Sequence, residues 1–240
     1  NHFNQLQTKF LATVQREGWP LNDMSANINS YDSQVSPALR DGKRVVYFLI
    51  DALRLDLAQD LASSIHGHTV TRLPACAQLP CVTRFGMASL LPDSDQSLQF
   101  QEKGSELIPF HGETEVNTRK ARLGIFESML NDRVRTSNLT DFLSVTKTPA
   151  SLEKYKKKTE SCDLMVLTST ELDALGEGVS TSNLQLIPSV MRKLQLAISR
   201  CAELGYETAI IGTDHGFIWV EDTDAGSICE KPAGDWKINK

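Results

Sequence analysis

Long apolar runs are missing from this sequence, and no basic stretch followed by an apolar one marks its first residues. We therefore predict no membrane-spanning segment, no secretion signal and no membrane partner. Cysteine is sparse: the sequence has only five, which is an odd number. No two of them form a C-x-x-C motif. A reducing, cytoplasmic setting fits this usage best, with most cysteines acting as small buried apolar residues.

Excess positive charge is lacking too. The 25 basic and 30 acidic side chains give a net charge of −5, which offers no global attraction to nucleic acid or anionic lipid. Three enzyme signatures are also absent: the G-x-S-x-G of serine hydrolases, the phosphate-binding P-loop, and a G-x-G-x-x-G after a strand. A haloacid-dehalogenase-like phosphatase needs a second aspartate two residues after its strand-end aspartate, and Leu53 stands there.

What the sequence does contain is a set of apolar strands that end on acidic residues. Residues 45–50 lead into Asp51, residues 208–212 lead into Asp214 and His215, and a third strand over 163–168 has Asp173 just beyond it. Strands that alternate with helical segments predict an α/β fold, with a largely parallel central sheet flanked by helices. Because the carboxyl ends of parallel strands share one edge, these acidic residues should converge there.

The remaining segments suggest a domain organisation around that sheet. We expect a helix and loop extension over residues 1–42, a core over 43–220, and a polar tail over 221–240. Residues 93–117 are polar and without clear periodicity, which indicates a small inserted cap or loop. A further short strand is predicted over residues 68–73.

Four of these side chains form a mixed oxygen and nitrogen donor set. Asp51, Asp173, Asp214 and His215 together suit Zn²⁺ or Mn²⁺. A plain alternative stays open, because a strand-end aspartate can also cap the helix that follows it, and Asp173 can be an ordinary loop acid.

The candidate nucleophile is Thr83, at the first turn of a predicted helix, where free backbone N–H groups and the helix dipole favour an anionic phosphoryl group. Coordination to a metal would lower the pKa of its hydroxyl. Arg84 and Arg54 are candidates to clamp phosphoryl oxygens. A helix-capping threonine and two surface arginines are the alternative interpretation.

This pattern resembles the alkaline phosphatase superfamily and, within it, the PglZ domain. The resemblance rests on three segments in the family's order: I-D-A-L-R at 50–54, L-P-C-V-T-R-F-G-M at 79–87, and T-D-H-G-F at 213–217. It implies that Asp51, Asp214 and His215 bind one metal. It also implies that Thr83 is the nucleophile bridging two metals.

The resemblance further implies a metal-dependent phosphoesterase in bacterial phage exclusion of the BREX type. Its expected cofactors are two Zn²⁺, with Mn²⁺ or Mg²⁺ as substitutes. Its expected partners are a phosphorylated substrate, such as a nucleotide or nucleic acid, and other proteins of the same defence system. The segment D-A-L-G-E at 173–177 would serve the second metal through Asp173 and Glu177.

Two departures from the family pattern affect that second site. Glu177 stands where many superfamily members carry histidine, and no histidine follows His215, although the family supplies one further downstream. We therefore expect a piece of a longer protein with an incomplete second metal site. The alternative function is a catalytically weak or inactive scaffold of the same fold within a multi-protein phage-exclusion complex.

Overall fold

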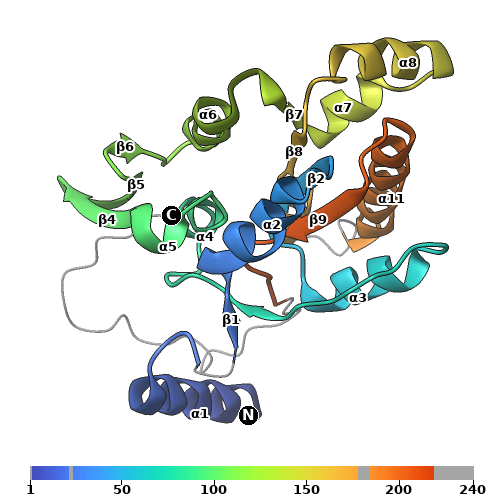
Figure 1. The fold of residues 1–240 in the computed structure, drawn as a ribbon. Coiled ribbons are helices and arrows are strands. Elements are labelled where there is room, and N and C mark those ends of the chain that lie inside the picture. The colour runs from blue at the N-terminus through green and yellow to red at the C-terminus, as the bar shows by residue number, and fades with distance from the viewer. Residues whose placement is uncertain (1, 22–23, 178–183, 219–240) are drawn as a thin grey trace.

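A four-stranded parallel sheet forms the centre of the computed structural model, which describes residues 2–21, 24–177 and 184–218 (Figure 1). The strands lie in the order β7-β8-β2-β9, and β2 pairs in parallel with both β8 and β9. Their bounds are β2 (Val45–Ile50), β7 (Val134–Asn138), β8 (Leu164–Ser169) and β9 (Thr208–Gly212). The expected α/β fold with a largely parallel sheet is confirmed.

In the described ranges of the chain, five helices cover one face of the sheet. Val46, Phe48 and Ile50 of β2 point into this layer, where the apolar stripe of α11 packs against them. Alternation along a strand sends every second side chain to the same face, so these three residues share it. The helices of this layer are α3 (Leu55–Ser64), α7 (Leu139–Val145), α8 (Pro149–Lys158), α9 (Glu171–Glu177) and α11 (Ile187–Glu203).

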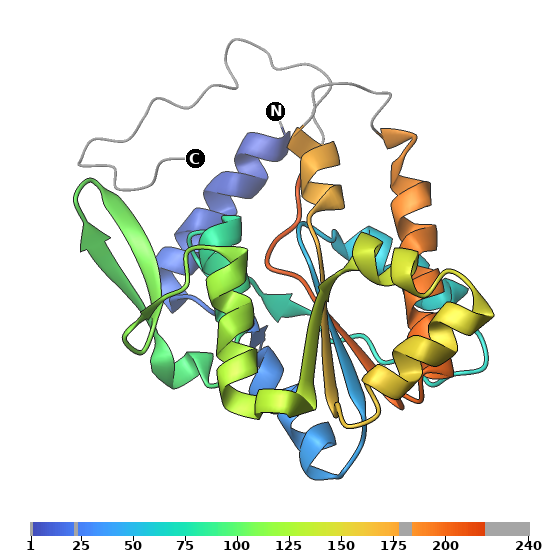
Figure 2. The ribbon, with the colours of Figure 1, turned by 90° about the horizontal axis from the view of Figure 1, so that it is seen from above.

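The opposite face receives Val45, Tyr47 and Leu49 of β2. Their partners come from the helical segments η2 (Tyr31–Val35), α2 (Ser36–Arg40), α4 (Thr83–Ser89) and α6 (Arg119–Leu130). The result is three layers, with the sheet between two sets of helices (Figure 2). Helices cover both faces of the sheet at β2, and every residue of that strand is buried. This explains why β2 is a continuous apolar run in the sequence.

A second, antiparallel sheet forms within the segment expected to be a small cap or loop. Its strands, in the order β4-β5-β6, are β4 (Leu98–Lys103), β5 (Glu106–His111) and β6 (Thr114–Glu115), preceded by the short helix α5 (Ser94–Ser97). Phe100 of this sheet contacts Phe85 of α4, with ring centroids 4.9 Å apart. The inserted segment is thus an ordered sheet that packs beside the helix carrying Thr83.

The N-terminal residues begin with α1 (His2–Glu17) and continue through β1 (Ser25–Ala26) and the 3₁₀ turn η1 (Asn27–Asn29). Tyr31 and Val35 lie in the predicted N-terminal extension, and both are fully buried against the sheet. The prediction of a strand over residues 68–73 is wrong, because these residues form no strand. Instead β3 (Ala75–Cys76) pairs in parallel with β1.

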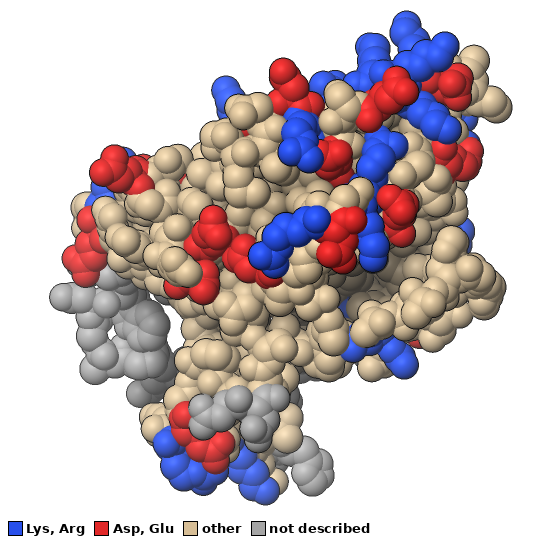
Figure 3. All heavy atoms as spheres, viewed as in Figure 1, with Lys and Arg blue, Asp and Glu red and all other residues tan. Residues whose placement is uncertain are grey.

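Charge is unevenly distributed on the face drawn in Figure 3, where basic side chains gather over α8. The last turn of α8 carries Lys156, Lys157 and Lys158 and leads toward the beginning of β8, away from the edge where Asp51 lies. Among the residues that the structure describes, no helix is both long enough and apolar enough to span a bilayer. The expected polar tail, residues 221–240, lies outside the described residues.

Candidate metal centre

Asp51 and Asp214 follow neighbouring strands and are both buried, with exposures of 1% and 0%. The two strand-end turns are joined by hydrogen bonds: the Ala52 N–H donates to Asp214 Oδ1 at 3.1 Å, and the Leu53 N–H donates to Thr213 Oγ1 at 3.0 Å. Ala52 has a φ of +57°, a left-handed conformation that is unfavourable for alanine by roughly 1–2 kcal/mol. The adjoining contacts therefore hold the turn after Asp51 in a specific shape.

The Thr83 side chain points at this pair of turns. Its hydroxyl donates to Asp51 Oδ1 at 3.2 Å, and its oxygen lies 3.3 Å from His215 Nε2. The residue that caps α4 is Val82, and Thr83 is the first helical residue. Thr83 is therefore not the capping residue of α4, and its hydroxyl is directed to the acidic cluster.

Asp173 completes the group from a third element, the first turn of α9. One ligand atom each from Asp51, Asp173 and His215 lie within 4.8 Å of one another. Asp214 adjoins them, since its Oδ2 lies 3.4 Å from His215 Nε2. Asp51, Asp173, Asp214 and His215, the mixed donor set proposed from the sequence, thus lie together at one edge of the sheet.

The electrostatics of the cluster favour a bound cation. Burial raises the pKa of Asp51 to about 8, and the charges of Asp214 and Asp173 contribute to the same shift. Burial also raises the pKa of Asp214. Among the residues that the structure describes, none donates a hydrogen bond to the buried Oδ2 of Asp214, whose neighbour at 3.4 Å is His215 Nε2. An unsatisfied carboxylate oxygen away from water is costly. Three crowded carboxyl groups and one imidazole nitrogen fit the donor preferences of Zn²⁺ or Mn²⁺.

Glu177, Arg54 and Arg84 were also predicted to belong to the site, but their side chains lie outside the cluster or are paired elsewhere. Glu177 is exposed at the last residue of α9, outside the group formed by Asp51, Asp173 and His215. The guanidinium of Arg54 is paired with Asp56 at 2.6 Å, and that of Arg84 with Glu106 at 3.5 Å.

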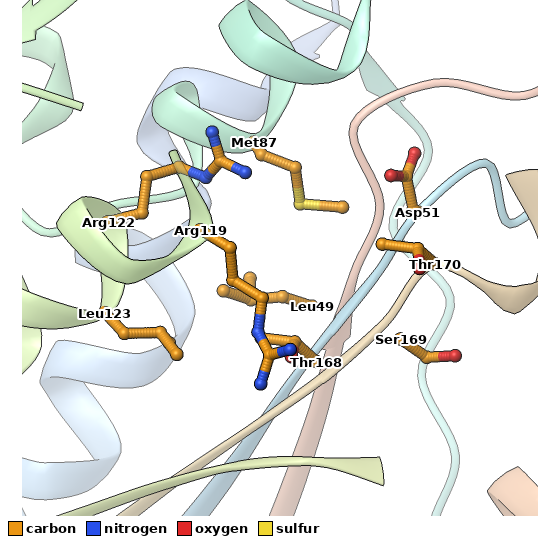
Figure 4. A pocket seen from close by; sticks show the side chains of 9 residues that line it. All are labelled: Leu49, Asp51, Met87, Arg119, Arg122, Leu123, Thr168, Ser169 and Thr170. Atoms are coloured by element: carbon orange, nitrogen blue, oxygen red, sulfur yellow. The ribbon is translucent and has the colours of Figure 1, made fainter. Parts of the chain in front are cut away.

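Two other arginines, which we did not single out from the sequence, border the cluster. Arg119 and Arg122 of α6 line a small cavity together with Asp51 and Thr168 (Figure 4). Their spacing of three residues places both on one face of a helix, which is visible in the sequence. Nothing in the sequence indicates that this face turns toward Asp51.

Asn27 is a second residue that we missed. Its side-chain amide donates to the backbone oxygen of Thr213 at 2.7 Å and lies 3.4 Å from that of Asp214. Asn27 is buried and belongs to η1, almost 190 residues away in sequence from the aspartate that it helps to position.

Comparison of this chain with known proteins finds a matching family and a similar protein. A family model described as the BREX system PglZ alkaline phosphatase-like domain matches residues 30–231. The Alkaline phosphatase-like protein PglZ of Bacillus cereus (strain H3081.97) is 21% identical over an alignment of 231 residues, and the match covers 92% of this chain and 26% of that protein. The chain spans about a quarter of the length of this curated relative.

Proposed function

Because the chain belongs to the family of BREX system PglZ alkaline phosphatase-like domains, we propose that it is the catalytic domain of a metal-dependent phosphoesterase in phage defence. The observation that supports this most is the position of Thr83, whose hydroxyl lies 3.2 Å from Asp51 Oδ1 and 3.3 Å from His215 Nε2. A hydroxyl in contact with both a carboxylate and an imidazole is poised to lose its proton.

In this proposal Asp51, Asp214 and His215 hold one divalent cation, and Asp173 takes part on the side of α9. Zn²⁺ fits the donors best, with Mn²⁺ or Mg²⁺ as substitutes. Bound there, such a cation lowers the pKa of a neighbouring hydroxyl and screens the negative charge of a phosphoryl group. Glu177 joins a second site in this scheme only if its exposed side chain turns toward Asp173.

Thr83 provides the covalent step. Its oxygen forms a bond to phosphorus while the bond from phosphorus to the leaving oxygen breaks in line, and that oxygen leaves with the electron pair. The hydroxyl proton of Thr83 passes toward Asp51 Oδ1, which already accepts its hydrogen bond, and the leaving oxygen takes a proton from water. A water molecule then attacks phosphorus, the bond from phosphorus to the Thr83 oxygen breaks, and that oxygen recovers its proton from Asp51. The product is phosphate from a monoester substrate and a phosphate monoester from a diester substrate.

The substrate and partners are those that the family implies. We propose a phosphodiester, a nucleotide or a nucleic acid end as the substrate, and other components of the phage-exclusion system as protein partners. For Arg54 and Arg84 to clamp a phosphoryl group, each would have to leave its ion pair with Asp56 or Glu106.

Hydrolysis of bis(p-nitrophenyl) phosphate by the zinc- or manganese-loaded protein tests the proposal. We expect Thr83→Ala to lower kcat by about 100-fold or more, and Thr83→Ser, which keeps a hydroxyl, to retain much of the rate. Anomalous scattering from crystals soaked in zinc should place a metal between Asp51, Asp214 and His215. Full activity of Thr83→Ala would show that another group is the nucleophile.

A scaffold role is the second candidate function. It is favoured by the position of Glu177, which leaves the expected second metal site without one of its predicted ligands. On this alternative the domain keeps the fold and contributes binding surfaces to a complex, with weak or no catalysis. Absence of hydrolysis with Zn²⁺, Mn²⁺ and Mg²⁺, in protein that binds those ions, would support the scaffold.

A further inference from the structure

The ring of Phe217 joins the turn after β9 to helix α9. A Cβ at Gly176 of α9 would stand 3.1, 3.1 and 3.2 Å from Cδ1, Cγ and Cδ2 of this ring. A point almost equally far from these three atoms lies over the face of the ring and not at its edge. The helix and the ring are therefore in face contact, which the missing side chain of Gly176 permits.

The start of α3 also contacts this ring. The guanidinium carbon of Arg54, the residue before α3, lies 5.2 Å from the ring centroid, within the range of a cation–π contact. The stem of Arg54 lies against the same turn, because a Cβ at Gly216 would stand 3.5 Å from Arg54 Cα and Cγ. Phe217 is half-buried and packs on the same apolar core as Leu172 of α9. Contacts from two helices and the core thus hold the ring in place.

Helix α9 is anchored at its other end as well. The carboxylate of Glu171 pairs with Lys193 at 2.6 Å and accepts a hydrogen bond from the Thr140 hydroxyl at 2.8 Å. Asp173 lies between this anchor and the ring, and its spacing of three residues from Gly176 places both on one face of the helix. The contact between Gly176 and the ring therefore sets how far Asp173 extends into the metal centre.

We propose that Phe217 is a positioning residue of the metal centre. Its ring spaces α9 from the turn that presents Asp214 and His215, and so fixes the place of Asp173 beside them. A donor set divided between two elements binds a cation tightly only while those elements keep their separation. The inference rests on the metal centre of the proposed phosphoesterase, and it gives Phe217 no part in the bond-breaking step.

The test measures the affinity of the full chain for Zn²⁺ by isothermal titration calorimetry. We expect Phe217→Ala to raise the Kd for Zn²⁺ about tenfold. Gly176→Ala, which pushes the helix and the ring apart, should raise it about threefold or more. Leu55→Ala is the matched control, because it removes an exposed apolar side chain from a hollow that Phe217 also borders. Its Kd should stay within about twofold of the parent value.

Thermal unfolding and a double-mutant cycle separate positioning from a general loss of stability. Alanine favours a helix over glycine, so Gly176→Ala should keep the Tm of the parent while it weakens zinc binding. Once Phe217→Ala has removed the ring, the new Cβ at position 176 no longer meets it. The double variant should therefore bind Zn²⁺ no more weakly than Phe217→Ala alone.

Cobalt in place of zinc provides a spectroscopic signature. Zn²⁺ has a filled d shell, whereas the visible absorption of Co²⁺ depends on the number and geometry of its ligands. We expect Phe217→Ala to shift this absorption toward the spectrum of Asp173→Asn, because both changes affect the same ligand. Leu55→Ala should keep the parent spectrum.

Parent affinity and a parent cobalt spectrum in both Phe217→Ala and Gly176→Ala would overturn the inference, as would losses that add in the double variant. A loss confined to Phe217→Ala, with a lower Tm, would show that the ring serves packing alone and would overturn it too.

The result is separable from catalysis. The expected pattern of zinc binding, in a protein that hydrolyses nothing, supports the inference and contradicts the phosphoesterase proposal. Hydrolysis that depends on Thr83, with metal binding indifferent to Phe217 and Gly176, does the reverse. A parent protein that binds neither Zn²⁺ nor Co²⁺ overturns both.

Discussion

Gly86 of α4 lies directly against Asp214, so closely that a Cβ at position 86 would stand 2.6 Å from the Cβ of Asp214. It would also stand 3.2 Å from the Cα of Asp214, where the backbone has little freedom to move. This contact sets how near α4 approaches the turn after β9. The hydroxyl of Thr83, three residues earlier, reaches the cluster because of that approach.

We therefore predict that Gly86→Ala displaces α4 or Asp214. The free energy of unfolding should fall by about 1–3 kcal/mol from overpacking, although alanine favours a helix over glycine by ~1 kcal/mol. Urea denaturation measures the free energy of unfolding. Calorimetric titration should show that the Gly86→Ala variant binds Zn²⁺ more weakly than the parent protein. Gly124→Ala on α6 is the matched control, because nothing lies within 4 Å of its new Cβ and the protein should become slightly more stable.

The stability of the metal-free protein should depend on pH through Asp51. Its pKa is raised to about 8 by burial, and next by the charges of Asp214 and Asp173. His215 and Arg122 also face it. In the unfolded chain this carboxyl ionises near pH ~4. Between these values the folded state retains a proton that the unfolded state has released, so the free energy of unfolding falls as pH rises, by at most ~1.4 kcal/mol per pH unit.

Urea denaturation of chelator-treated protein at pH 5, 6.5 and 8 measures this slope. Asp51→Asn should flatten it, whereas Asp41→Asn, at an exposed position, should leave it unchanged. Saturating Zn²⁺ should reverse the trend, because the cation binds the ionised carboxylates and competes with protons. A parent protein whose stability rises from pH 5 to 8 without metal would contradict the crowded arrangement of these carboxyl groups.

Asn27 should matter for metal affinity although it is not a ligand. Its amide donates to the backbone oxygen of Thr213 and lies near that of Asp214, so it positions the turn that presents Asp214 and His215. Asn27→Asp replaces that donor with a buried negative charge, and we expect a loss of about 2 kcal/mol or more in stability, together with weaker zinc binding. Asn29→Asp, an exposed residue of the same turn, should change neither by more than ~0.5 kcal/mol.

Much of this arrangement was predictable because the sheet is buried on both faces. Strands β2 and β8 appear in the sequence as apolar runs for that reason, and the residues after them could be placed at a common edge. Strand β7 was missed because, after Val134, it carries only polar side chains at the edge of the sheet. The cap strands were missed too, since β4 is mostly exposed and lacks a clear apolar alternation.

The position of a side chain within the site was less predictable than its presence there. The sequence suggests Arg54 and Arg84 because they lie near Asp51 and Thr83 along the chain, yet their guanidinium groups pair with Asp56 and Glu106. Arg122 lines a cavity beside Asp51 because α6 packs against the sheet, and no local sequence pattern encodes that packing. Long-range packing of helices on the sheet decides such contacts, and a single sequence contains no direct record of it.

Asp173 and Glu177 offer the sharpest test of the second metal site, because they lie one helical turn apart on α9 and differ in placement. Asp173 belongs to the cluster with Asp51 and His215, whereas Glu177 is exposed at the end of the helix. We predict that Asp173→Asn weakens zinc binding about tenfold or more, and that Glu177→Gln has a much smaller effect. Calorimetry with both variants, and metal counting by mass spectrometry, measure the difference. Equal losses in the two variants, together with a second bound ion in the parent, would show that Glu177 turns inward when metal binds, as the family pattern implies.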